Sequence, residues 1–430
     1  MLRRRGIWTN RDFTRLWSAA TVSAFGTHIT HIALSFVAIL SLRVSPLQIG
    51  LLSVAGTLPA FAVGLFAGAW VDRLRRRPIM IGADIFRAAM LLTVPVAAWL
   101  DALSFVHLLV VAAAMSVAST CFEVADRSML PSVVGRNDLP EANRMLAAGT
   151  TVAETTGFGI AGWLVQVVSG PGALAVDAAT FIWSAFILAR IEGVEARPDW
   201  NGGGGSIRRE IVEGIRFIVG HGILRPLGRT VFIMSLAQNA IGAVFLLYVT
   251  TELGFEPGVL GMIFATGGLF SLAGSLLGGR MTARFGVGPL LIASLLLTGV
   301  GQGLPALATG ATLLGALWLL ASQGADIGWT LYGITEVTLR QEITPEPWQG
   351  RMNGSFHVLA TGGSLVGALL GGLLGNTLGL RPTLLLGALG IAAAALPLLL
   401  SPIRTMRVAP PSSASSSSSP SSSASSPSSS

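Results

Sequence analysis

Long apolar stretches separated by short polar ones make up most of the chain. A helix needs about 20 apolar residues to cross the hydrocarbon core of a bilayer. Twelve stretches approach this length: 16–42, 47–71, 78–100, 104–126, 146–168, 173–190, 227–250, 258–278, 288–308, 312–336, 354–376 and 383–402. No stretch alternates with the period of two that a membrane β-barrel requires. The pattern predicts an all-α protein with twelve transmembrane helices.

The first hairpin of this pattern recurs in the second half of the chain. Five pairs of residues follow in the same order, each 211 positions apart: Pro46 and Pro257, Gly50 and Gly261, Gly68 and Gly279, Arg73 and Arg284, and Pro78 and Pro289. Membrane proteins built from two related halves commonly move these halves around a central site. The repeat therefore predicts two pseudo-symmetric six-helix bundles and a transport function.

Polar segments divide the chain into four parts. We expect bundles at 1–192 and 226–403, a cytoplasmic linker at 193–225, and a tail at 404–430. The tail is almost purely Ser, Pro and Ala beyond its first residues, a composition that cannot bury a core, and we expect it to be disordered.

The linker combines a flexible start with a short helix. Residues 201–206 read NGGGGS, which is typical of a flexible connection. Four isoleucines then share one helical face: Ile207, Ile211, Ile215 and Ile218. This pattern favours an amphipathic helix on the inner membrane surface, and a soluble connector helix is the alternative.

Composition and charge narrow the function classes. A chain that is 52% hydrophobic and 11% charged, with a mean hydropathy of +0.69, is not a soluble globular protein. All 28 basic residues are arginine, so the lysine of an ATP-binding P-loop is missing and the chain is not itself an ATP-driven pump. Cys121 is the only cysteine, so no disulfide forms within the chain.

The arginines are distributed unevenly about the predicted spans. With the N-terminus inside, Arg43 and Arg381 lie outside and Arg87 lies in the middle of a span, which leaves 25 of the 28 on one side or at the span ends that face it. Arginine-rich loops face the cytoplasm, so we expect both termini to be cytoplasmic. This placement accounts for the net charge of +7 without a nucleic-acid partner.

The turn after the second predicted span contains a compact charged motif. It comprises Gly68, Asp72, Arg73, Arg76 and Arg77. The glycine allows close helix packing, and an aspartate among arginines can exchange ion-pair partners. The motif resembles the signature loop Gly-x-x-x-Asp-Arg-x-Gly-Arg-Arg/Lys of the major facilitator superfamily. The resemblance implies a gate in which the aspartate latches the two halves together on the cytoplasmic side in the outward-open state.

The two copies of this loop differ from the signature in different ways. Arg75 stands where the signature has glycine, whereas the second copy, with Gly279 and Arg284, keeps that glycine and has Ala283 in place of aspartate. The resemblance therefore implies a strong latch on one side only. An ordinary arginine-rich loop would explain the arginines but would explain neither the aspartate nor the repeat.

Further segments resemble the enterobactin-exporter and macrolide-efflux branch of the superfamily. They are 10–17 (NRDFTRLW), 45–50 (SPLQIG), 83–88 (ADIFRA), 130–134 (LPSVV), 141–143 (EAN) and 338–341 (TLRQ). These matches extend over nearly all of residues 8–404. They imply an exporter of a small amphipathic molecule, such as an antibiotic or a siderophore, in the plasma membrane of a bacterium. They do not identify the substrate, because the branch carries chemically unrelated molecules.

Glycines are spaced for close packing in the fifth and eleventh spans. Gly157, Gly159 and Gly162 resemble the antiporter signature Gly-Pro-x-x-Gly-Gly, with Phe158 in place of its proline. The eleventh span has counterparts at Gly367, Gly371 and Gly372. An antiporter element and plain glycine-mediated packing both fit this pattern.

Ionisable residues inside the spans are candidates for coupling, because charge at membrane depth is costly. The candidates are Asp84, Arg87, Glu123, Asp126, Arg127, Glu154 and Asp326. They could form a proton-responsive network. For Asp84 and Arg87, which share a helical face, a permanent structural pair is favoured. We expect Glu123 to be the proton-accepting group.

Polar residues of the first and seventh spans, which face the central site in the fold that the resemblance implies, are candidates for a substrate cavity, and residues of the tenth span are candidates for its wall. They are His28, His31, Gln238, Asn239, Gln323 and Trp329. The two histidines lie three residues apart on one face, but a metal site needs further ligands, so we expect neither a metal nor a cofactor.

The sequence thus favours a monomeric secondary transporter that exports an amphipathic molecule, with protons as the coupling ion. An importer or facilitated-diffusion carrier on the same fold is one alternative, and a non-transporting membrane receptor is another. An enzyme is not expected, because no loop is long enough for a catalytic domain and no nucleophile–base pair is clustered.

Overall fold

The computed structural model describes residues 7–71, 74–135, 137–192 and 207–408. Within these ranges the regular structure is helical and no strand occurs, which confirms the predicted all-α class. Ten helices there are long and apolar enough to cross a membrane. One of them, α5, contains two crossings, and the interrupted pair α10–α11 provides another, so the described helices make twelve crossings.

The first group of helices contains five long elements. They are α1 (Arg11–Phe36), α2 (Pro46–Val71), α3 (Arg76–Trp99), α4 (Phe105–Val133) and α5 (Leu139–Ala189). Asn10 caps the start of α1, where its side chain accepts hydrogen bonds from the backbone N–H groups of Asp12 and Phe13. The 51-residue α5 is broken at Ser169, whose φ of 69° is not helical.

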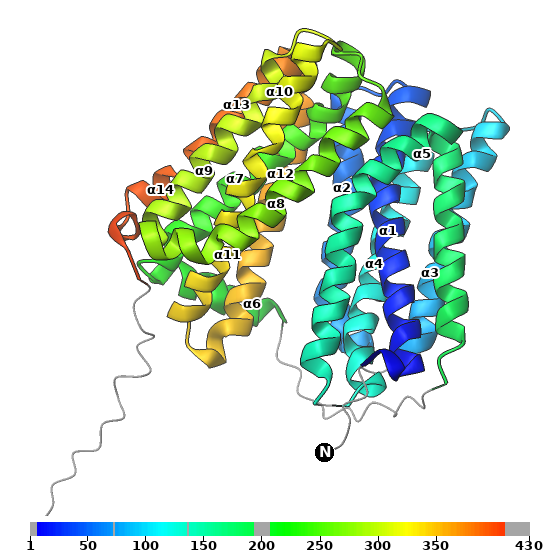
Figure 1. Cartoon of the computed structure of the whole chain (residues 1–430), viewed down its shortest axis with the longest axis horizontal. Coiled ribbons are helices and arrows are strands. Elements are labelled where there is room, and N and C mark those ends of the chain that lie inside the picture. The colour runs from blue at the N-terminus through cyan, green and yellow to red at the C-terminus, as the bar shows by residue number, and fades with distance from the viewer. Residues whose placement is uncertain (1–6, 72–73, 136, 193–206, 409–430) are drawn as a thin grey trace, which may run out of the picture.

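The second group follows the short helix α6 (Ile207–Gly220). Its elements are α7 (Leu224–Leu247), α8 (Pro257–Phe285), α9 (Val287–Gly303), α10 (Leu313–Gln323), α11 (Ala325–Ile343), α12 (Gln349–Leu378), α13 (Leu380–Ala393) and α14 (Leu396–Leu399). Figure 1 shows the two groups side by side, joined at one end and diverging toward the end at which α1 begins and α6 lies. The main contacts between the groups join α5 to α8 and α2 to α12.

The sequence repeat is reproduced in the backbone. α2 and α8 begin at Pro46 and Pro257, 211 positions apart. Immediately before these helices, α1 and α7 end in π-helical turns at Val37–Ser41 and Tyr248–Glu252, which are also 211 positions apart. Proline is favoured at a helix start because the missing N–H would be unsatisfied there anyway. The prediction of two pseudo-symmetric bundles is therefore confirmed at the level of individual turns.

The backbone also explains one departure from the signature loop. Gly286, in the second copy, has φ 87°, a conformation that favours glycine. The equivalent residue 211 positions earlier is Arg75, whose φ of −68° any residue can adopt. Glycine is needed in one copy of this turn and not in the other.

Two predicted spans differ from the observed helices. The stretch 312–336 is interrupted at Gly324, where α10 ends before α11 begins. α4 continues to Val133, beyond the predicted end at residue 126, so Glu123 lies ten residues before the helix end. The apolar pattern stopped early because Asp126 and Arg127 interrupt it, although the helix continues through them.

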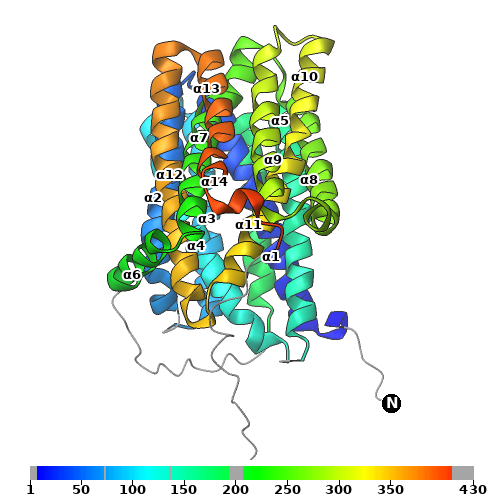
Figure 2. The ribbon, with the colours of Figure 1, turned by 90° about the vertical axis from the view of Figure 1, so that its left-hand side faces the viewer.

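The linker helix packs against the second group. Gly214 of α6 lies against Ser355 and the Arg351 carbonyl of α12, and Glu213 forms an ion pair with Arg351 at 3.3 Å. Figure 2 shows α6 at the lower end of the molecule, near α12. A position on the inner membrane surface stays a prediction. Residues 193–206, which include the NGGGGS segment, and residues 409–430 of the predicted tail lie outside the described residues.

Candidate functional site

Glycines allow the two groups of helices to touch at the end where they meet. Gly162 of α5 lies against Gly261 of α8, so a Cβ added at Gly162 would lie 2.9 Å from the Gly261 Cα. On the other side of the molecule, Gly372 of α12 lies against Pro46 and Leu47 of α2. Backbones approach this closely only where side chains are small.

Hydrogen bonds reinforce the same end. The Gln166 amide donates to Glu256 Oε2 at 2.8 Å and accepts from the Gly258 N–H at 2.7 Å. These bonds join α5 to the start of α8. We call this end, defined by Gly162, Gly261 and the Gln166 contacts, the closed end.

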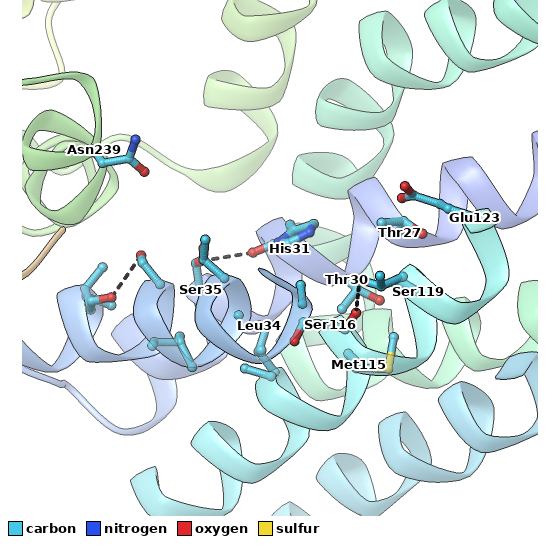
Figure 3. A pocket seen from close by; sticks show the side chains of 18 residues that line it. Thr27, Thr30, His31, Leu34, Ser35, Met115, Ser116, Ser119, Glu123 and Asn239 are labelled. Atoms are coloured by element: carbon cyan, nitrogen blue, oxygen red, sulfur yellow. Dashed lines mark hydrogen bonds between the residues drawn. The ribbon is translucent and has the colours of Figure 1, made fainter. Parts of the chain in front are cut away.

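A cavity of about 360 Å³ lies mainly among α1, α2 and α4. Hydroxyl groups dominate its polar lining: Thr27, Thr30, Ser35, Ser53, Thr57, Ser116, Ser119 and Thr120. Figure 3 shows His31 and Glu123 at this cavity, with Asn239 reaching it from α7. We call it the hydroxyl cavity.

The hydroxyl residues were missed as site residues in the sequence. Thr27 and Thr30 on α1, and Ser116 and Ser119 on α4, repeat at helical spacing within otherwise apolar spans. This polar stripe is the signal that could have revealed the cavity.

A second cavity, of about 540 Å³, lies between the groups and is bordered mainly by α5, α7, α8 and α11. Four aromatic side chains line it: Phe158, Phe245, Phe264 and Trp329. Its principal polar side chains are Glu154, Gln238, Gln323 and Asp326. We call it the aromatic cavity. The structure thus brings together five sequence candidates from three separate parts of the chain: Glu154, Gln238, and the trio Gln323, Asp326 and Trp329.

Helices α1 and α7 border both cavities. On α1, His31 lines the hydroxyl cavity and Ile32 lines the aromatic one. On α7, Asn239 lines the hydroxyl cavity and Gln238 lines the aromatic one. Neighbouring residues on each helix therefore face different cavities. Asn239 is also held in place, since its amide donates to Ser364 Oγ at 2.9 Å.

His28 has a different position from His31. Its ring lies against Gly157 and is 6.1 Å from the Phe158 ring, so it packs between α1 and α5. Among the described residues, no group of three or more His, Cys, Asp or Glu side chains could hold a metal ion.

Asp84 and Arg87 form a buried ion pair on α3. Arg87 Nη2 donates to Asp84 Oδ1 and to Ser23 Oγ, the latter at 3.0 Å. The guanidinium also lies between the Phe122 and Phe181 rings, 4.5 and 4.3 Å from their centroids. Both charged side chains are at most 1% exposed. The pair therefore ties α1, α4 and α5 to α3 and lines neither cavity.

Asp177 is a second buried acid, and it adjoins the hydroxyl cavity. One of its carboxylate oxygens accepts a hydrogen bond from Thr30, which lines that cavity, and the other accepts from Thr180 at 3.1 Å. Gly26 leaves room for this carboxylate beside α1.

The charged candidates of α4 are more exposed to solvent than Asp84, Arg87 and Asp177. Glu123 and Arg127 are exposed, and Glu123 faces the hydroxyl cavity. Asp126 is half-buried, and its Oδ1 has no hydrogen-bond partner among the described residues. In the described part of the chain, none of the three is in an ion pair within 4.0 Å.

Part of the predicted gating motif lies beyond what the structure describes. Asp72 and Arg73 are outside the described residues, and Gly68 lies in the last turns of α2. Arg76 begins α3, and Arg77 Nε donates to the Leu188 carbonyl at 2.9 Å. Arg77 therefore joins the start of α3 to the end of α5 within one group.

The glycine and the arginine of the second copy of the motif lie at open positions. A side chain added at Gly279 would meet open space, and the Arg284 guanidinium lies 5.4 Å from the Phe285 ring centroid.

Comparison with known proteins places the chain among membrane transporters. A model of the family described as "transmembrane secretion effector" matches residues 8–425. The multidrug efflux pump Tap of Mycolicibacterium fortuitum is 31% identical over 284 residues, which are 63% of this chain and 67% of Tap. An uncharacterized MFS-type transporter of Sinorhizobium fredii is 25% identical over 322 residues, covering 72% of this chain and 75% of its own length.

Solved structures share the fold. A bacterial homologue of the iron transporter ferroportin, crystallised in an inward-facing state, matches with a TM-score of 0.71 and 18% identity, over 92% of this chain and 99% of that one. The nucleoside transporter NupG matches with a TM-score of 0.72 and 14% identity, over 90% and 98%. At these identities the likeness shows the fold alone.

Proposed function

The chain belongs to the transmembrane secretion effector family of the major facilitator superfamily, and from this premise we propose that it exports a small amphipathic molecule by alternating access. It is a multi-pass membrane protein whose relatives are transporters, and relatives that include the Tap multidrug efflux pump support export as the direction.

One observation carries the proposal. The two groups of helices touch through Gly162 and Gly261 at the closed end, while two cavities lie along α1 and α7 between that end and the opposite one. Breaking the closed-end contacts and forming new ones at the other end would expose the same cavities to the other side. Both cavities have the mixed apolar and polar lining that suits an amphipathic substrate.

The orientation and the parts of the chain belong to the same proposal. The arginine distribution supports cytoplasmic termini in the plasma membrane of a bacterium, so the closed end would face outward. The bundles would be 1–192 and 226–403, moving as rigid bodies about the linker. In the opposite state, Asp72 would latch the cytoplasmic side.

Protons are the proposed driving ion. Glu123 faces the hydroxyl cavity and forms no ion pair in the described part of the chain, so it can take up and release a proton without breaking a structural contact. Asp84 is a poorer candidate because Arg87 holds it in a buried pair. Glu154 and Asp326 are the next candidates.

Transport in reconstituted vesicles tests this function. Vesicles with a pH gradient should accumulate a fluorescent amphiphile against its concentration gradient, and a protonophore should abolish the accumulation. Equilibration without accumulation would instead assign a facilitated-diffusion carrier, and binding without any flux would assign a receptor.

Cysteine labelling tests the orientation. In a Cys121→Ser background, Ser45→Cys and Glu252→Cys, at half-buried and exposed positions, should react with a membrane-impermeant maleimide from outside intact cells. Arg76→Cys and Gln349→Cys should react only after the membrane is opened. Reaction of the second set in intact cells would overturn the proposed topology.

A further inference from the structure

The aromatic cavity carries charge of one sign. Among its described lining residues, the charged side chains are Glu154 and Asp326, and none is basic. Neither acid is in an ion pair within 4.0 Å in the described part of the chain. A carboxylate that loses water without gaining a partner costs free energy, so these acids need either a positive partner or a proton when the cavity closes.

The two acids come from different groups of helices. Glu154 lies on α5, in the first group, and Asp326 lies in the first turn of α11, in the second. Two adjacent glycines of α8 leave room for Asp326 and for Thr155, the residue next to Glu154. A Cβ at Gly267 would lie 2.8 Å from Gln323 Oε1 and would also collide with Asp326, and one at Gly268 would collide with Thr155.

Aromatic rings surround the same space. Phe158 meets Phe264 edge-on with centroids 6.4 Å apart, and Phe245 lies 5.8 Å from Phe264. These three rings come from α5, α8 and α7, so they form one continuous apolar wall. Trp329 of α11 is 41% exposed and also lines the cavity. Aromatic faces attract cations, and tryptophan does so best.

We propose that the aromatic cavity binds a lipophilic organic cation, with its charge between Glu154 and Asp326 and its apolar body against the aromatic wall. This inference rests on the proposed function and names the substrate class of the same site. An anion of equal size would face two carboxylates, and a neutral molecule would leave both unpaired. The volume of about 540 Å³ is within the range that holds a drug-sized ligand.

The position of the acids also links binding to movement. Because they belong to different groups, closure of the cavity changes their distance from a bound charge. With both acids ionised and no cation bound, closure would bring two like charges into a medium of low dielectric constant. A cation between them removes this penalty and favours the closed cavity.

The test uses two tetrahedral probes of nearly equal size and opposite charge. The full chain, purified in detergent with Cys121 intact, is equilibrated by dialysis with radiolabelled tetraphenylphosphonium or tetraphenylborate. We expect saturable binding of the cation and none of the anion. Asp326→Asn and Glu154→Gln should each weaken cation binding by at least about tenfold, as loss of one partner of a desolvated charge pair does.

Two matched variants control for folding and for general loss of charge. Asp326→Glu keeps the charge and should retain most of the affinity. Asp101→Asn removes one acid from the loop between α3 and α4 and should leave binding unchanged. Every variant is first checked for a monodisperse size-exclusion profile.

The results separate this inference from the proposed function. Equal affinity for the two probes, cation binding that survives both neutral variants, or no saturable cation binding to folded protein would each overturn the inference. Because binding is measured without a membrane or a gradient, a protein that binds the cation through Asp326 but moves nothing across vesicles defeats the export proposal only.

Discussion

Arg43 and Gly254 occupy equivalent turns of the two halves, and both have a left-handed backbone, with φ of 50° and 77°. Each follows a π-helical turn and precedes the proline that starts the next helix. Glycine adopts this conformation freely, whereas another residue pays about 1–2 kcal/mol. The first half therefore carries backbone strain that the second half avoids.

Arg43→Gly should consequently be neutral or stabilising by up to about 1 kcal/mol, because relief of the strain outweighs the extra freedom of glycine in the unfolded chain. Gly254→Ala should destabilise by about 1 kcal/mol or more. Thermal unfolding in detergent measures both changes. Gly333→Ala is the control, since Gly333 lies within α11, has no such φ and faces open space. A stabilising Gly254→Ala would contradict the strain argument.

The closed-end glycines give a second prediction. Gly162→Ala should push α5 away from α8, because the new methyl group would collide with the Gly261 backbone. Overpacking of this kind costs about 1–3 kcal/mol, enough to shift a two-state population about fivefold or more. Gly159→Ala, one turn away, would make ordinary contact with Ala265 at 3.4 Å and serves as the matched control.

Accessibility of the hydroxyl cavity measures this shift. Thr57→Cys, in a Cys121→Ser background, places a thiol on the cavity wall. An impermeant maleimide added from the closed-end side should label it faster in Gly162→Ala than in Gly159→Ala. Equal rates would mean that the glycine contact does not hold this end closed.

The buried pair on α3 can be assigned to structure or to coupling. Asp84→Asn leaves Arg87 buried without its counter-ion, which should cost about 3–5 kcal/mol of stability. The double variant Asp84→Asn/Arg87→Met removes both charges and should recover most of that loss. Unfolding midpoints in detergent check this order. A stable Asp84→Asn protein that loses only proton-driven accumulation would assign the pair to coupling instead.

The sequence predicted the elements better than it predicted the site. The apolar stretches and the 211-residue repeat are local patterns, so the spans and their two-fold relation could be read directly. The extension of α4 past residue 126 could not, since a helix keeps its backbone hydrogen bonds where its side chains become polar. The interruption at Gly324 could not be predicted either, because a glycine that ends a helix and a glycine that packs within one look the same in sequence.

The cavities depended on packing that the sequence does not display. Phe158, Phe245 and Phe264 come from three helices, and only tertiary structure unites them. Many cavity hydroxyls bond to their own helix, as Thr120 does to the Ser116 carbonyl at 2.9 Å, and so resemble ordinary helix residues. The shared helical face of Asp84 and Arg87 did predict their pairing, but the position of the pair away from both cavities is visible only in the structure.

The latch can be tested although Asp72 lies outside the described residues. Asp72→Asn should weaken closure of the cytoplasmic side, because the amide cannot form the expected ion pair with an arginine or favour a helix N-terminus. Flux should fall while equilibrium binding of the substrate survives. Vesicle transport and dialysis on the same preparation provide the comparison, and unchanged flux would rule out the latch.

The coupling role of Glu123 leads to the last prediction. The carboxylate faces the hydroxyl cavity from α4, and in the described part of the chain no arginine is within 4.0 Å of it. It can therefore be reached by protons from the open side. Glu123→Gln removes the titrating group but keeps the shape and the polar contacts of the side chain. Proton-driven accumulation in vesicles should fall to simple equilibration, while energy-independent exchange of substrate should continue. Glu141→Gln, in the first turn of α5 and outside both cavities, should leave both activities intact. If Glu123→Gln still concentrates substrate against its gradient, the coupling site lies elsewhere, with Asp326 and Glu154 as the next groups to neutralise.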